Sequence, residues 1–329
     1  MSQHAGLPAS GEQAANGINE PSFLMRAAST ASVGVALFLI AVKVFALAAT
    51  DSVAMLSSLI DSSLDAAASF LNFWAIRQSL MPADRSHRFG HGKVEPLASL
   101  GQAAFIIGSA VLLVFQSIQY ILRPRVVENV GIGMGAMVIS ILMTLGLVMF
   151  QKYVVRKTKS VAISADYAHY AGDVMLNLSV MLSLFIGAHF HFRYADPIFA
   201  LLIAVYLLFS AGGILKTSFM QLVDTELPVE EKRKITQVVM NHPDVRGMHD
   251  LRTRSSGTQW FIQLHLEIDP KLTLSRAHAI ADEVEDSLCR AFPNAEVFIH
   301  EDPAGLYEQH PDWCYDTFEP PEKNSSPVP

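Results

Sequence analysis

Cysteine and charge are both scarce in this sequence of 329 residues. Only two cysteines occur, Cys289 and Cys314, which excludes a disulfide framework and a cysteine-rich zinc cluster. Charged residues make up 17% of the chain and the formal net charge is −7, so the basic surface of a nucleic-acid-binding protein is lacking and we expect no nucleic-acid partner. The first 22 residues also lack the basic start and short apolar core of a signal peptide.

Hydrophobic residues, in contrast, make up 51% of the chain, a large share for a soluble domain with so few charges. Long apolar runs fill roughly residues 28–218, whereas residues 225–303 have the composition of an ordinary soluble domain. The expected parts are a disordered cytoplasmic tail at 1–23, a membrane domain at 24–220, a cytoplasmic domain at 225–303 and a disordered acidic tail at 304–329.

Six stretches are long and apolar enough to cross a bilayer, because a transmembrane helix needs about 20 mostly apolar residues. They lie at about 28–49, 53–80, 94–122, 130–154, 161–189 and 194–217. An even number of spans places both termini on one side. The loops after the second and fourth spans are rich in lysine and arginine, so the positive-inside rule predicts cytoplasmic termini, although Arg123 and Arg125 lie on the other side.

The soluble section has the pattern of a small α+β domain. A helix is predicted from Pro228 to about 241, followed by alternating runs at 246–255 and 258–268 that a Ser256-Gly257 turn joins. A second helix at about 274–291 and a strand near 295–301 complete it. The order helix, strand, strand, helix, strand predicts a small open sheet with helices on one face, attached to an α-helical membrane domain.

Two pairs of polar residues with the same spacing lie inside the predicted spans. Asp61 and Asp65 are four residues apart in the second span, and His169 and Asp173 are four apart in the fifth. Each pair shares one helix face, and charges at that depth are costly and rarely kept without a partner or an ion. Three carboxylates and one imidazole suit a tetrahedral zinc ion. The alternative is a structural hydrogen-bond network between the helices.

Two further groups lie outside the spans. In the loop after the second span, Asp84, His87 and His91 could form a second metal site, although loop histidines are often simply solvated. The cytoplasmic domain gathers residues that suit zinc ligation on its predicted strands and second helix. They are His249, His265, His278, His300 and Asp302. Each of them taken alone is more typical of an ordinary surface or packed residue.

Together these segments resemble the cation diffusion facilitator family, and most closely its bacterial zinc and ferrous-iron efflux members. The resemblance covers roughly residues 24–303 and rests on several segments of the sequence. They are AMLSSLIDSSLD, HRFGHGKVEPLASL, HYAGDVMLN, LVDTELP, GMHDLRTR, FIQLHLE, AHAIADEVE and FIHEDP. One position departs from relatives: Glu301 stands where they carry glutamine, which changes the charge of the cytoplasmic site.

The resemblance implies a secondary transporter and not an enzyme. It implies transport, loop and cytoplasmic metal sites at the three groups of residues above, the last in a metallochaperone-like domain. It also implies a homodimer in the bacterial inner membrane, held partly by charge interactions near Lys93 and Asp224. The expected reaction is proton-coupled export of Zn²⁺ by alternating access, with Cd²⁺, Fe²⁺, Co²⁺ and Mn²⁺ as further candidate substrates.

The sequence also leaves two rival functions open. His87 and His91 have the HxxxH spacing of membrane metalloenzymes of the desaturase kind, but such enzymes need several more histidine boxes at the membrane face. A non-transporting metal sensor of the same fold is the second rival. It would be expected to lack an intact set of intramembrane ligands, whereas Asp61, Asp65, His169 and Asp173 are all present.

Overall fold

The computed structural model describes residues 11–50, 53–122, 131–190 and 194–305. Residues 306–329 of the tail expected at 304–329, which include Cys314, and the first ten residues lie outside these ranges. The chain divides into two units, one at Asn19–Leu222 and the other at Val223–Pro329 together with Met1–Ile18.

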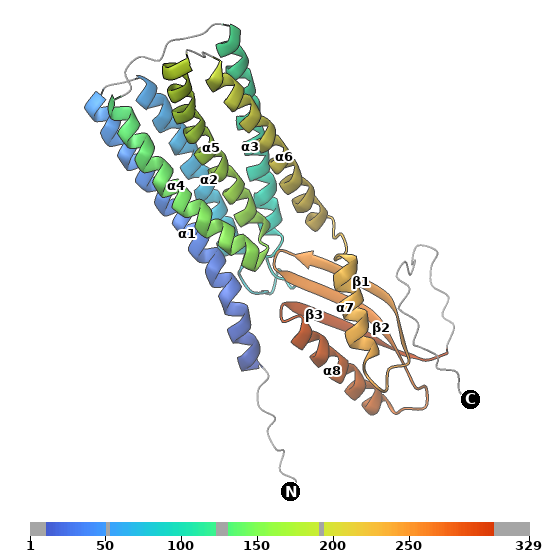
Figure 1. Cartoon of the computed structure of the whole chain (residues 1–329). Helices are drawn as coiled ribbons and strands as arrows, with labels where there is room; N and C mark the ends of the chain where they lie inside the picture. Colours follow the sequence, from blue (N-terminus) through green and yellow to red (C-terminus); the bar gives the residue numbers. More distant parts are fainter. Residues whose placement is uncertain (1–10, 51–52, 123–130, 191–193, 306–329) are drawn as a thin grey trace. The chain divides into compact units, whose positions relative to one another are not determined.

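The first unit is a bundle of six long helices that lie side by side (Figure 1). Their bounds are α1 Gly11–Thr50, α2 Val53–Ser79, α3 Val94–Leu122, α4 Gly131–Thr158, α5 Val161–Phe190 and α6 Ala195–Leu222. In the described part of the chain, α1, α3, α4 and α6 are apolar enough to cross a membrane by length and composition. The other two helices carry the four predicted intramembrane ligands, Asp61 and Asp65 on α2 and His169 and Asp173 on α5. The expected helical membrane domain is confirmed.

Helix α1 begins earlier than hydropathy predicts. We expected the first span to start near residue 28 and residues 1–23 to form a tail, but the helix already begins at Gly11 and continues through Pro21. A polar extension does not register in a hydropathy pattern, although its alanine, glutamine and glutamate residues favour helix. Packing supports the part next to it, since Met25 and Ala28 are fully buried.

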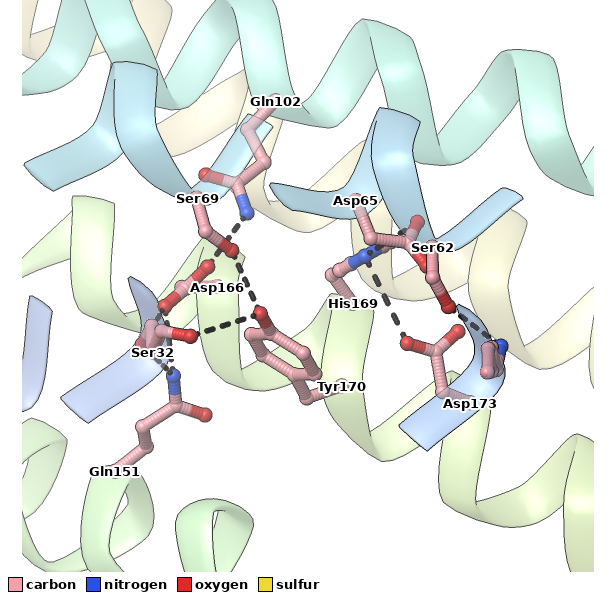
Figure 2. Close-up of polar contacts among 11 residues, drawn as sticks. Ser32, Ser62, Asp65, Ser69, Gln102, Gln151, Asp166, His169, Tyr170 and Asp173 are labelled. Carbon is pink, nitrogen blue, oxygen red and sulfur yellow. Dashed lines mark hydrogen bonds and ion pairs between the residues drawn. The ribbon is translucent and has the colours of Figure 1, made fainter. Parts of the chain in front are cut away.

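A buried polar network ties four of the helices together. The carboxylate of Asp166 on α5 is completely buried and accepts hydrogen bonds from Ser32 on α1, Gln102 on α3 and Gln151 on α4 (Figure 2). The two glutamine nitrogens lie 3.1 and 2.7 Å from the carboxylate oxygens. A buried carboxylate is tolerated only when its oxygens are satisfied, so this network fixes the position of α5 against three neighbours.

Two side chains set how α2 faces α5. The hydroxyls of Ser69 on α2 and Tyr170 on α5 are 2.7 Å apart in the buried interior (Figure 2). Less than one turn further along α2, Asn72 donates to the carbonyl oxygen of Ala162 on α5 at 3.3 Å. Because residues three, four and seven apart share a helix face, these contacts turn Asp65 toward α5.

The second unit is a three-stranded sheet with two helices. Its elements are α7 Val229–Met240, β1 Gly247–Ser256, β2 Gln259–Ile268, α8 Leu274–Ala291 and β3 Ala295–Pro303. The strand order is β1-β2-β3, with β1 antiparallel and β3 parallel to β2. The predicted order of helix, strand, strand, helix, strand is therefore confirmed.

Alternation along the strands separates a helix-covered face of this sheet from an open face. Ile262, Leu264 and Leu266 of β2 are buried in one apolar core with residues of α7 and α8. The side chain of His265 lies between them in sequence and therefore points to the open face. The register of β1 shifts between His249 and Arg252, so a bulge lies directly beside one of the predicted ligands.

Removing the Asp166 carboxylate should destabilise the bundle. We expect Asp166→Ala to lower the free energy of unfolding by about 2 kcal/mol or more, because it leaves three buried donors without their acceptor. Thermal unfolding in detergent micelles would measure this. Asp196→Ala is the matched control, since Asp196 accepts a bond from Ser183 near the helix end, and Asp166→Asn should lose less. Equal unfolding temperatures for wild type and Asp166→Ala would contradict this role.

Candidate metal sites and family membership

The start of α5, which carries two predicted ligands, is fixed by local sequence. Lys159 adopts a left-handed conformation with φ of 53° and separates α4 from α5. Ser160 then caps the helix, because its hydroxyl oxygen accepts a bond from the N–H of Ile163 at 3.2 Å. The same hydroxyl lies 2.6 Å from the buried carboxylate of Glu95 on α3. The rotation and height of α5 are thereby set at its first turn.

Three of the four predicted intramembrane ligands form a close group. The Nε2 atom of His169 lies 3.2 Å from Asp65 Oδ1 and 3.7 Å from Asp173 Oδ2 (Figure 2). One ligand atom from each of these residues lies within 4.8 Å of the others. The Nε2 atom is buried and makes no well-aligned hydrogen bond, so a cation between the three side chains would satisfy it. The chemistry of the group is that of a small divalent metal site.

The fourth predicted ligand, Asp61, lies beside this group and not within it. Its side chain is exposed and lines a cavity of about 190 Å³ together with Asp65 and Asp173. Helices α1, α2, α4 and α5 all contribute to the wall. Three carboxylates therefore face one polar cavity among apolar helices.

The cavity also contains a charge that the spacing arguments missed. Lys43 of α1 lines the same wall, and its ammonium donates to the carbonyl oxygen of Ser58 and the hydroxyl of Ser62, both on α2. The signal was present in the sequence, because an ionisable residue within a transmembrane segment marks a functional site by default. Asp166 of α5 carried the same signal.

The loop residues also come together. Asp84 Oδ1 lies 3.3 Å from His87 Nδ1, and Asp84 Oδ2 lies 3.5 Å from His91 Nε2. The backbone N–H of His87 and both the backbone N–H and the hydroxyl of Ser86 donate to the same carboxylate. These bonds lower the pKa of Asp84 to about 2. The carboxylate is thus an anion at any physiological pH, while buried His91 Nδ1 has no hydrogen-bond partner. The group can hold a metal with open coordination positions.

In the cytoplasmic unit, one residue from each strand meets on the open face of the sheet. Asp302 Oδ2 lies 2.7 Å from His265 Nδ1 and 3.4 Å from His249 Nε2. Asp302 itself is buried, while the two imidazoles are half-buried. The strand register explains the meeting, because His249 pairs with His265 across β1 and β2.

The remaining predicted cytoplasmic residues lie on different faces. His300 pairs with His265 in the register of β2 and β3, and its Nε2 is 3.3 Å from Asp302 Oδ1. His278 is on α8, so it lies on the helix-covered side, with its Nδ1 3.7 Å from the carboxylate of Glu301. The close group within one chain is therefore His249, His265 and Asp302, with His300 beside it.

The two residues expected in a dimer contact have partners within their own units. Lys93 donates to the carbonyl oxygen of Leu222 at 3.4 Å. Asp224 lies 3.5 Å from Arg254, and its φ of 57° places it in the left-handed region. Their role between two chains stays a prediction.

Comparison with known proteins yields matches along nearly the whole chain. The model of the cation efflux transmembrane domain matches residues 29–223, and that of the cation efflux protein cytoplasmic domain matches residues 227–304. The cation-efflux pump FieF of Klebsiella pneumoniae subsp. pneumoniae is 44% identical over 283 residues, which cover 86% of this chain and 94% of that pump. FieF of Serratia proteamaculans is 43% identical over 289 residues, covering 87% of this chain and 96% of that pump.

A solved structure of a transporter domain resembles part of this chain. The metal-bound C-terminal domain of the CzcD transporter from Thermotoga maritima is 28% identical, with a TM-score of 0.24, and the match covers 25% of this chain and 99% of that domain. The family models together, and the FieF pumps, span both units. This chain is therefore a membrane transporter that belongs to the cation efflux family, the cation diffusion facilitators.

Proposed function

We propose that this protein exports divalent transition metal cations, Zn²⁺ above all, in exchange for protons, with Asp61, Asp65, His169 and Asp173 as the transport site. The observation that carries the proposal is the buried His169 Nε2 between the oxygens of Asp65 and Asp173. Oxygen and imidazole nitrogen ligands suit Zn²⁺. They also accept Cd²⁺, Fe²⁺, Co²⁺ and Mn²⁺, which are the alternative substrates.

Proton exchange follows from the chemistry of the ligands. Each carboxylate and the imidazole must be free of its proton to hold a metal, and histidine changes its protonation state in the physiological pH range. Metal and protons therefore compete for one set of atoms. A site that faces the cytoplasm would load metal, and the same site facing the proton-rich outside of an energised cell would be protonated and emptied.

The wider arrangement is part of the same proposal. The protein would be a homodimer in the bacterial inner membrane with both termini in the cytoplasm, and Lys93 and Asp224 would contribute to its contacts. Metal at His249, His265, His278, His300 and Asp302 would stabilise the arrangement of the cytoplasmic domains that binds it best. The loop site at Asp84, His87 and His91 would bind metal on the cytoplasmic side.

The transport site predicts the effect of removing a single ligand. We expect Asp61→Ala, Asp65→Ala or Asp173→Ala to reduce zinc flux into inside-out vesicles by at least about 100-fold, since even residues that only support a ligand change metal affinity by about 10- to 100-fold. Asp196→Ala removes a carboxylate that does not line the cavity and should keep normal flux. A folded Asp65→Ala protein that keeps half of the wild-type flux would refute the assignment.

The cytoplasmic site predicts a response to metal in the absence of transport. Zinc should raise the unfolding temperature of the 225–303 fragment and favour its dimer, because a ligand that binds only the folded dimer stabilises it. His265→Ala should abolish this shift. His242→Ala is the control, since that imidazole pairs with Glu283 at 3.0 Å. If wild-type fragment shows the same unfolding temperature and sedimentation with and without zinc, this site does not bind it.

The ligand at position 61 is expected to affect the selectivity of the site between Zn²⁺ and Cd²⁺. Replacing Asp61 by His exchanges a carboxylate oxygen for a nitrogen and adds bulk, so the site should keep small Zn²⁺, with bonds to nitrogen of about 2.0 to 2.1 Å, and lose the larger Cd²⁺. Paired fluxes of the two metals through wild type and Asp61→His measure this, with Asp61→Asn as the control for lost charge. A cadmium-to-zinc ratio that stays constant or rises while zinc flux survives would contradict it, and loss of both fluxes would mean that the ring blocks the site.

A further inference from the structure

We propose that Lys43 is a fixed internal cation that matches the charge of the transport cavity to a divalent ion and limits how tightly that ion binds. This inference rests on the proposed transport site. It assigns to α1, which supplies none of the proposed ligands, a residue that sets the affinity for the transported metal.

The side chain of Lys43 shares the cavity with the carboxylates of the proposed transport site. Lys43 lines the cavity together with Asp61, Asp65 and Asp173, and it interacts electrostatically with all three. Its hydrogen bonds go to Ser58 and Ser62 on α2, the helix that carries the first two carboxylates. Among the described residues, no ion pair within 4 Å joins Lys43 to these carboxylates, so their oxygens stay available to a metal.

The charges that line the cavity balance the charge of one divalent cation. Three carboxylates and one ammonium have two net negative charges when ionised, which one divalent cation neutralises in full. Without the ammonium, one net negative charge would remain after metal binding. Uncompensated charge is costly among apolar helices, and a positive charge a few ångströms from a divalent ion weakens its binding strongly at the low effective dielectric of such a site. Lys43 therefore makes the metal-loaded cavity neutral and also favours release of the bound ion.

The test measures zinc uptake into inside-out vesicles and separates the KM for zinc from the maximal rate. In Lys43→Met, the KM should fall by at least about tenfold and the maximal rate should fall with it, because the ion leaves more slowly. Lys43→Arg keeps the charge and should keep both values near wild type. Lys152→Met is the matched control, because it removes the same charge from an exposed position of α4 that does not line the cavity.

A purely structural role for Lys43 predicts a different pattern, in which the maximal rate falls while the KM stays the same or rises. That pattern would overturn the proposal, and so would Lys43→Arg behaving like Lys43→Met. Lys43→Gln is a second neutral variant that can keep the bonds to α2. If both neutral variants failed to assemble while Lys43→Arg did so, the ammonium would be a packing requirement and the proposal would be rejected.

Asp65→Ala, measured in the same vesicles, separates this inference from the function on which it rests. If Asp65→Ala abolishes uptake but Lys43→Met keeps the wild-type KM, the role of Lys43 alone is wrong. If Asp65→Ala transports zinc with the wild-type KM, the cavity is not the transport site and both proposals fall.

Discussion

A carboxylate that no water reaches must be satisfied by other helices, and in this bundle that requirement is met at Asp166. Its oxygens take hydrogen bonds from three helices at once, at a position one turn before His169 on the same helix. The cost of leaving such a group unpaired is high. The helix that carries two proposed ligands is therefore held against three other helices of the bundle through this one carboxylate.

Much of this architecture could be predicted from the sequence, because it depends on local periodicity. Hydropathy found the six long helices, and alternation with turn residues found the order of elements in the cytoplasmic domain. Spacing by four residues predicted that His169 and Asp173 share a face of α5, which their contacts in the close group bear out. Each of these inferences needs only the geometry of one helix or strand.

Features that depend on the contact of distant segments could not be predicted in this way. The spacing of Asp61 and Asp65 does not say which carboxylate meets His169, because the rotation of α2 is set by the pairing of Ser69 with Tyr170. Lys43 occurs singly within an apolar helix, so no repeated spacing indicated its role. Asp166 precedes His169 and Asp173 on the same helix, and spacing alone does not say that its carboxylate bonds to three other helices. Strand alternation, in contrast, could have separated Glu301 from His300 and Asp302, and thus His278 from the open face of the sheet.

The two-residue connection between α4 and α5 has a mechanical consequence. With Lys159 in a left-handed turn and Ser160 capping the next helix, the two helices cannot separate at this end, so relative motion between them is a rotation about it. At a rise of 1.5 Å per residue, His169 lies about 12 Å along the lever arm, and a rotation of about 10° would shift it by about 2 Å. The imidazole is thus close enough to the pivot to be tilted out of contact with its partners, yet too close to be carried far across the membrane.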